Sequence, residues 1–316
     1  MQQQIFQTRR LFVLKLIRKR DRVLYNANEW KKWGGRVFSI TFMIWVLIVV
    51  WLLLQVTTIT SFRVPSYSMY PTLIPGDYML VNKWVIGARL FDIWNVVEGK
   101  KTKIYRLSGI RKVKRNDVLV FHNPYPHSAD TLAMHLLKYY VKRCIALPGD
   151  TMSIKDGVYY IKNVNELIGN IQAQKRIESF KEQTNGFLVK DVYPQDKYMD
   201  WSIRNFGPLH IPAKGQTITM DSTAAKLYGK LIEWEQKKAL KWVKEGVYLG
   251  DSLIREYSFL ENYYFMSGDN LEISNDSRHW GLVPEPYIVG VATRIWNSVD
   301  KFTGETRWDR VMKKIE

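Results

Sequence analysis

The chain has 316 residues, of which 47 are Lys or Arg and 30 are Asp or Glu, so its net charge is +17. This length and an apolar fraction of 46% suffice to fill one large hydrophobic core or two modest ones. The single cysteine, Cys144, excludes an intrachain disulfide and a metal site built from cysteines.

The first 36 residues form a basic segment, with ten basic and two acidic residues and a net charge of +8. Its part Arg9–Arg22 alternates basic clusters with apolar residues, which fits a helix lying on an anionic leaflet. A solvated basic tail fits equally well. No recognisable nucleic-acid motif accompanies the charge, so we expect no nucleic-acid partner.

An apolar segment without a charged residue follows, from Val37 to Phe62. As a helix, Val37–Val56 would be about 30 Å long, the thickness of the hydrocarbon core of a bilayer. A buried core helix is the alternative, but these residues are apolar on every face. A cleaved signal peptide would have a shorter leader and an A-x-A-like site, which TTITSFRVPS does not supply. We predict an uncleaved transmembrane anchor at 37–60.

Basic residues concentrate before this span, and eight of them are Lys15, Arg18, Lys19, Arg20, Arg22, Lys31, Lys32 and Arg36. Positively charged flanks stay in the cytoplasm, so the amino-terminal segment 1–36 is predicted to be cytoplasmic and everything after Thr57 to be exported. We find no second convincing span, which gives a single-pass topology.

Short runs rich in Val, Ile, Tyr and Phe then alternate with turn residues, a pattern typical of a mainly β domain. Strands are expected at Tyr78–Val81, Val118–Phe121, Tyr139–Leu147, Thr217–Met220, Tyr263–Met266 and Ile288–Ile295. Residues 152–161 predict a hairpin, in which Asp156 and Gly157 supply the positive φ of a type I′ turn. A helix is predicted over Ala224–Trp234, capped by Asp221 or Ser222.

Two serines, Ser66 and Ser68, lie in a stiff segment with prolines at 65, 71 and 75. Such a segment suits a nucleophile because it holds the hydroxyl and nearby backbone donors in place, although serine and proline also simply make turns. The histidines have no catalytic motif context, but His279 or His135 could complete a Ser-His-Asp site. Cys144 is a further candidate nucleophile, against which stands the frequency of small buried thiols in strands.

Lys142 is a second candidate base, because it lies in an otherwise apolar strand. Burial disfavours the charged form of a lysine and lowers its pKa, as a lysine general base at neutral pH requires. The alternative places Lys142 on the solvent face of the strand.

Four sequence boxes occur in order. They are Pro65-Ser66-x-Ser68-Met69-x-Pro71-Thr72-Leu73, Asn116-Asp117-Val-Leu-Val-Phe121, Val141-Lys142-Arg143 with Leu147-Pro-Gly-Asp150, and Ser267-Gly-Asp-Asn270 with Ser274-Asn-Asp-Ser-Arg278-His-Trp-Gly-Leu-Val-Pro284. This arrangement resembles the bacterial type I signal peptidases, a family with a Ser/Lys dyad on a largely β fold. The resemblance covers about residues 37–162 and 206–298, while 163–205 and 221–262 fit it only as variable insertions.

The resemblance implies that Ser68 is the nucleophile and Lys142 the general base, with an acyl-enzyme that water resolves. Ser66 and the Ser68 backbone N–H would form the oxyanion hole, and Ser274 would orient the lysine amine. It implies site-supporting pairs Arg143–Asp269 and Asp276–Arg278. It also implies a substrate strand beside shallow pockets, whose flanking residues are Val64, Pro65, Met69, Tyr140 and Val141. Neither a cofactor nor a metal is implied.

Some residues depart from the family pattern: Tyr67 between the two serines, Tyr70 after Met69, Asn116 before Asp117, and Leu271-Glu272-Ile273 in the last box. None of them removes a catalytic group, so they bear on the shape of the pocket.

The expected fold is mainly β, a signal-peptidase-like catalytic domain with an inserted smaller subdomain, preceded by one transmembrane helix. The catalytic domain would comprise 61–162 and 263–300, with a variable lobe at 163–262 and a polar C-terminal tail at 301–316. The expected partners are signal-peptide-bearing preproteins and a bilayer with anionic lipids. The expected location is the bacterial cytoplasmic membrane, with the catalytic domain on its outer, periplasmic side. A membrane-tethered, non-catalytic β scaffold or binding module is the alternative.

The stretch 84–94 contains Trp84, Phe91 and Trp94 soon after the nucleophile box. Full burial in the core is one interpretation. Because indole rings favour the membrane–water interface, the other is an apolar rim beside the active site that dips into the outer leaflet.

Overall fold

The computed structural model describes residues 32–52, 58–92, 94–95, 98, 104–125, 132–135, 138–179, 192–196 and 198–316. The chain forms two compact units, Met1–Val56 and Thr57–Glu316. The predicted interfacial helix at 9–22 lies outside the described residues.

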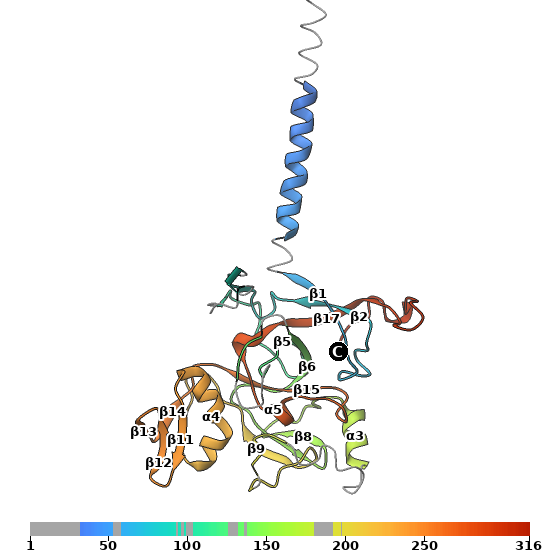
Figure 1. The fold of residues 1–316 in the computed structure, drawn as a ribbon. Coiled ribbons are helices and arrows are strands. Elements are labelled where there is room, and N and C mark those ends of the chain that lie inside the picture. The colour runs from blue at the N-terminus through green and yellow to red at the C-terminus, as the bar shows by residue number, and fades with distance from the viewer. Residues whose placement is uncertain are drawn as a thin grey trace, which may run out of the picture. The chain divides into compact units, whose positions relative to one another are not determined.

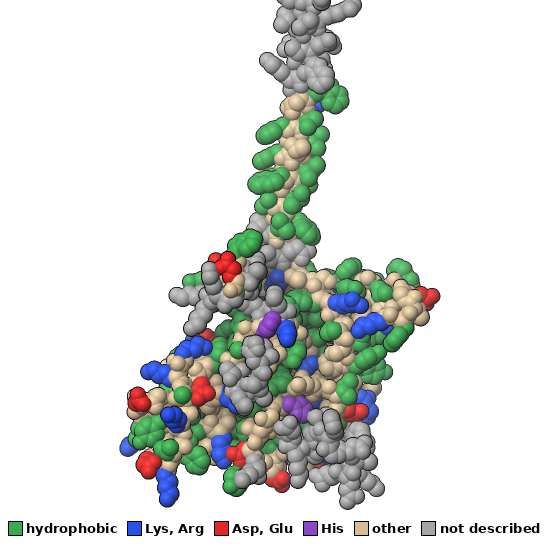
Figure 2. Space-filling view, in the orientation of Figure 1, with side chains coloured by type: hydrophobic (Ala, Val, Ile, Leu, Met, Phe, Trp, Pro, Cys, Tyr) green, Lys and Arg blue, Asp and Glu red, His purple; other side chains and the backbone are tan. Residues whose placement is uncertain are grey.

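The described residues of the first unit form one helix, Lys32–Leu52, with 21 residues, a mean hydropathy of 2.1 and no burial inside the protein. Apolar side chains cover its visible length (Figure 2). This helix is long and apolar enough to cross a membrane. The predicted anchor at 37–60 extends too far at its C-terminal end, because Ile59 and Thr60 already belong to a strand. They pair with Asn82 and Val81.

The second unit is built on a seven-stranded antiparallel sheet with the order β1-β2-β17-β5-β6-β15-β16 (Figure 1). These strands are β1 (Ile59–Arg63), β2 (Asp77–Asn82), β5 (Val118–His122), β6 (Tyr139–Ala146), β15 (Tyr263–Ser267), β16 (Val283–Pro284) and β17 (Ile288–Ser298). The mainly β prediction is confirmed. Five of these strands follow the apolar runs named above, with ends that differ by at most three residues.

Smaller sheets and helices complete this unit. The sheets are β3 (Arg89–Leu90) with β4 (Tyr105–Arg106); β7 (Thr151–Lys155) between β8 (Val158–Ile161) and β9 (Phe206–His210); β10 (Thr217–Thr219) with β14 (Glu256–Ser258); and β12 (Gly246–Leu249) between β11 (Leu240–Val243) and β13 (Ser252–Ile254). The helices are α3 (Ile171–Ser179), α4 (Ser222–Gln236), α5 (Ser277–Trp280) and the 3₁₀ turns η1 (Glu285–Tyr287) and η2 (Trp308–Arg310).

Local sequence explains two of these elements. Helix α4 begins after Asp221, whose side chain accepts the N–H of Ala224 at 2.7 Å, as a capping carboxylate does. Between β7 and β8, Asp156 and Gly157 have φ of 51° and 85°, as the predicted type I′ turn requires.

Two apolar cores lie on opposite faces of the main sheet, because side chains alternate along its strands. On β5, Leu119 and Phe121 enter the larger core, while Val118 and Val120 enter the smaller one. The larger core extends to α3, α4 and β7–β9. The described residues of the predicted variable lobe, 163–262, therefore share a core and a sheet with the β domain.

The C-terminal segment packs onto the β domain. Ile315 belongs to the smaller core, and the Arg310 guanidinium forms a buried ion pair with Asp77 at 2.6 Å. The segment predicted as a polar C-terminal tail, 301–316, thus has side chains with partners on the sheet.

Candidate active site

A closed loop between β1 and β2 carries Ser66 and Ser68. Its ends are joined by two hydrogen bonds, from Val64 N–H to Asp77 C=O at 2.8 Å and from Gly76 N–H to Val64 C=O at 3.1 Å. Met69 is fully buried in the smaller core. The buried Met69 side chain thus fixes the position of Ser68, whose own side chain stays partly accessible.

Lys142 lies on β6 and is 4% exposed. Its Nζ lies 2.7 Å from Ser68 Oγ and 3.2 Å from the Val141 carbonyl oxygen. Burial lowers the pKa of Lys142 from 10.5 to about 8; nearby Asp276 opposes the change, and Arg278 adds to it. The solvent-face alternative for Lys142 is therefore wrong, and the side chain reaches Ser68.

Ser66 and the last sequence box border this pair. Ser66 Oγ is exposed and lies 3.4 Å from Ser68 Oγ. From the other side, the Asn270 N–H donates to the Ser68 carbonyl at 3.1 Å, and the Asn270 side-chain amide donates to the Tyr67 carbonyl at 3.3 Å. The backbone on both sides of the Ser68 side chain is thereby held.

Gly268 allows the last sequence box to approach the Ser68 backbone closely, because it has no side chain. A Cβ at Gly268 would lie 2.2 Å from Ser274 Oγ and 2.4 Å from the Ser68 carbonyl oxygen, so a side chain there would displace both. Ser274 Oγ is buried and has no hydrogen-bond partner among the described residues. It therefore lies beside the pair, but the expected hydrogen bond to Lys142 is not formed.

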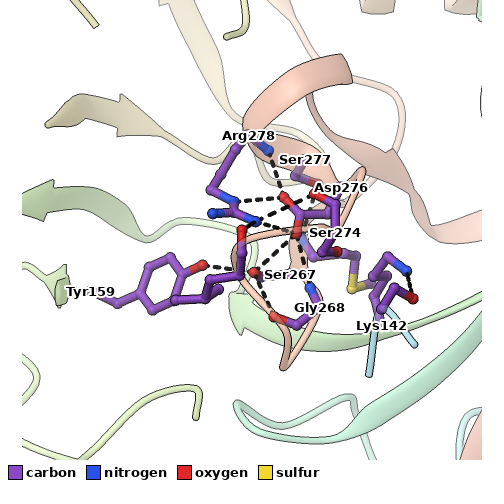
Figure 3. Close-up of polar contacts among 11 residues, drawn as sticks. Lys142, Tyr159, Ser267, Gly268, Ser274, Asp276, Ser277 and Arg278 are labelled. Atoms are coloured by element: carbon purple, nitrogen blue, oxygen red, sulfur yellow. Dashed lines mark hydrogen bonds and ion pairs between the residues drawn. The ribbon is translucent and has the colours of Figure 1, made fainter. Parts of the chain in front are cut away.

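A buried polar network lies next to Lys142 (Figure 3). On α5, Arg278 Nε donates to Asp276 Oδ1 at 2.8 Å, and Asp276 Oδ2 accepts the Gly268 N–H at 2.9 Å. Burial alone would raise the pKa of Asp276, but the charge and hydrogen bonds of Arg278 outweigh it and lower the pKa to about 2. The carboxylate is therefore ionised and fixes the Gly268 backbone.

A second buried ion pair joins β6 to the same box. Arg143 contacts Asp269 through both its Nε, at 2.7 Å, and its Nη2, at 2.6 Å. Thr72, in the nucleophile loop, donates its hydroxyl to the same carboxylate at 2.5 Å, and Arg143 Nη2 donates to the Glu316 carbonyl at 2.8 Å. Asp269 thus connects the loop of Ser68 to the strand of Lys142.

The predicted substrate-binding residues differ in accessibility. Pro65 is exposed, Tyr140 is half-buried and Val141 is 8% exposed. Val64 and Met69 are at most 1% exposed and pack in the smaller core, so their predicted contact with substrate stays a prediction.

One edge of β6 is open beside Lys142. β5 pairs with Tyr139–Arg143 on one side, whereas β15 begins its pairing only at Arg143 on the other. Within the described residues, the second edge of 139–142 is therefore without a strand partner. An extended peptide fits such an edge.

The other candidate nucleophile and bases do not join this site. Ser68 Oγ contacts Lys142 and Ser66 in the described part of the chain, and no histidine. Burial raises the pKa of the Cys144 thiol well above 9, which keeps it protonated. Among the described residues there is no cluster of three or more His, Cys, Asp or Glu that could hold a metal ion.

Sequence reasoning assigned no role to Thr72, Gly268 or Arg310. Thr72 and Gly268 lie inside the quoted boxes, and that membership was a usable signal. Arg310 had no such signal, because its partners, Asp77 and the Thr72 carbonyl, lie more than 230 residues away.

Comparisons with known proteins relate most of the chain to one group of enzymes. Residues 36–297 match the family model described as "Signal peptidase, peptidase S26". Signal peptidase I of Buchnera aphidicola subsp. Baizongia pistaciae is 27% identical over 91% of this chain and 83% of its own length. Signal peptidase I of Pseudomonas aeruginosa is 27% identical over 84% of this chain and 72% of its own. A signal peptidase I structure from Enterococcus faecalis covers 58% of this chain and all of its own, with 21% identity and a TM-score of 0.29.

Proposed function

Because the chain belongs to the signal peptidase family, peptidase S26, and is therefore a peptidase that removes signal peptides, we propose that it works through Ser68 as nucleophile and Lys142 as general base. The observation that carries this proposal is the 2.7 Å contact between Lys142 Nζ and Ser68 Oγ in a buried setting. A lysine there is substantially neutral near pH 8, so its lone pair can accept the hydroxyl proton.

The reaction then proceeds in two stages. Ser68 Oγ attacks the scissile carbonyl while its proton passes to Lys142, and the ammonium returns that proton to the leaving amine. The mature protein departs, and the signal peptide remains esterified to Ser68. Lys142 then takes a proton from a water that attacks the ester carbonyl, and it returns that proton to Ser68 Oγ as the signal peptide leaves with a free carboxyl group.

The oxyanion of each tetrahedral intermediate needs donors that face it. The Ser68 backbone N–H and the Ser66 hydroxyl are the two that we assign. Their support is the position of Ser66 Oγ, 3.4 Å from Ser68 Oγ, on a loop that is closed by hydrogen bonds at its base.

The substrate is an extended segment of a signal-peptide-bearing preprotein, paired with the open edge of β6 at 139–142. Main-chain hydrogen bonds to that edge would bring the scissile carbonyl to Ser68, because Lys142 lies at the end of the same stretch. Pro65 and Tyr140 are the accessible predicted contacts.

Cleavage of a preprotein by the purified full-length chain in detergent tests this function. The wild type is expected to release the signal peptide, while Ser68→Ala and Lys142→Met, which keeps the length of the side chain without its amine, are expected to lose at least about 10³-fold in rate. Lys155→Met, at an exposed lysine on β7, is the matched control and is expected to cleave normally. Near-normal turnover by Lys142→Met would contradict the assignment of the base.

A further inference from the structure

Tyr159 connects a separate part of the fold to the active site. It lies on β8, in the small sheet β8-β7-β9, and its ring belongs to the larger core with 7% exposure. Its hydroxyl donates to Ser267 Oγ at 2.7 Å, which brings the end of β15 against β8 (Figure 3).

This hydroxyl is a permanent donor. Burial raises the pKa of Tyr159 to about 12, so the phenol keeps its proton throughout the pH range in which Lys142 changes its charge. Ser267 Oγ, which is buried, lies 3.2 Å from the ionised Asp276 Oδ2. Because Tyr159 occupies an acceptor position of the Ser267 hydroxyl, the serine proton is directed toward Asp276 and the neighbouring Gly268 carbonyl, also at 3.2 Å.

The backbone after Ser267 packs tightly against the Ser68 carbonyl. Gly268 follows Ser267 directly, and the space at its Cα is filled by Ser274 Oγ and the Ser68 carbonyl oxygen. Two residues further on, Asn270 N–H donates to that same carbonyl. A shift of Ser267 therefore moves the backbone that holds Ser68 against Lys142.

Residues 168–174 hold Tyr159 in place. Gln174 on α3 accepts the Tyr159 N–H at 2.9 Å, and its amide donates to the Ile168 carbonyl at 2.7 Å. Gly169 leaves room for the tyrosine ring, since a Cβ there would lie 3.1 Å from it. This stretch thus contacts the ring edge of Tyr159 as well as its backbone.

We propose that Tyr159 is a positioning residue for the reaction: its hydrogen bond to Ser267 fixes the Ser267–Gly268 backbone and, through it, the alignment of Ser68 with Lys142. It touches neither the substrate nor the reacting atoms. This role rests on the proposed function of the Ser68/Lys142 pair.

Steady-state cleavage of a preprotein by the full-length chain tests the proposal. Tyr159→Phe removes only the hydroxyl, and kcat is expected to fall roughly tenfold, since small misalignments of reacting groups cost about that much or more, while KM stays within about twofold. Tyr160→Phe, the next residue on β8 and 51% exposed, is the matched control and is expected to keep both constants. An unchanged kcat in Tyr159→Phe, or a loss confined to KM, would overturn the proposal.

The double variant separates positioning from a general structural effect. If Tyr159 acts through Ser267, Ser267→Ala alone is expected to lower kcat by a similar factor, and Tyr159→Phe with Ser267→Ala is expected to lose no more than either change alone. Losses that multiply would overturn the proposal. If thermal unfolding shows that Tyr159→Phe does not fold, the kcat of Ser267→Ala is compared with that of the wild type instead. An unchanged kcat in Ser267→Ala would then overturn the proposal. A wild type without cleavage would contradict the proposed function instead.

Discussion

Lys142 is the residue whose environment decides the chemistry. Its sequence context left two faces of the strand open, because a single lysine in an apolar run fits either. Its neighbours Val141 and Arg143 are both buried as well, so alternation along β6 gives no solvent face at this point. The burial of Lys142 and its contact with Ser68 depend on the tertiary fold, and in the sequence only the resemblance of the four ordered boxes to a known family indicated them.

At Ser66, the account predicts a partial loss of activity. Ser66→Ala removes one donor to the oxyanion but leaves Ser68 and Lys142 in place, so kcat is expected to fall about 10²- to 10³-fold with little change in KM. Steady-state kinetics on a preprotein measure this. Wild-type kcat in Ser66→Ala would exclude the hydroxyl from the oxyanion hole.

At Arg278, the account predicts a loss of both stability and activity. Arg278→Met leaves the buried Asp276 carboxylate without its cation, which is expected to cost about 3–5 kcal/mol of unfolding free energy. Asp276 raises the pKa of Lys142 and Arg278 lowers it, so the variant is expected to have a higher Lys142 pKa. The folded part of the variant should therefore reach its full activity only at a higher pH than the wild type. Urea denaturation measures the first effect, and an unchanged midpoint would show that the pair is not stabilising.

Elements differ in how far sequence predicts them. The strands β2, β5, β6, β15 and β17 carry long apolar runs, and all were predicted. β16 has two residues and α5 has four, too short for any periodicity, and both depend on contacts with β15. The sheet β11–β13 was missed because its first strand exposes three of its four residues, so it has no alternating pattern.

The stretch 84–94 yields a prediction about lipid. Trp84 is 47% exposed and Trp94 is 78% exposed, so full burial is excluded for these two rings. Ile110, 76% exposed, donates its N–H to the Trp84 carbonyl and enlarges this apolar surface. Replacing Trp84, Phe91 and Trp94 with serine is expected to weaken binding of residues 58–316 to anionic vesicles without lowering the melting temperature.

Vesicle co-sedimentation measures this effect. Serine at Trp242, which is 55% exposed on β11, serves as the control for loss of an exposed aromatic side chain elsewhere. Unchanged lipid binding, or unfolding of the triple variant, would show that these residues only pack within the domain.

At the scale of the whole molecule, charge and hydropathy divide the chain at the anchor. The first 36 residues carry a net charge of +8, and Lys32–Leu52 is the one described helix that could cross a membrane. These features predict a cytoplasmic amino terminus and a catalytic unit on the outer side. Protease added to spheroplasts is expected to digest the part after Thr57 and to spare an amino-terminal fragment. Protection of the carboxy-terminal part would contradict this orientation.

The central claim is that a buried, neutral Lys142 activates Ser68, and the pH dependence of kcat/KM for preprotein cleavage tests it most directly. Below its pKa the lysine is protonated and cannot accept a proton, so kcat/KM is expected to rise with pH through a midpoint near 8 and then to level off. Ser66→Ala is expected to keep that midpoint with a lower plateau. A midpoint near 10.5, the ordinary lysine value, or a rate that does not change with pH would contradict the claim.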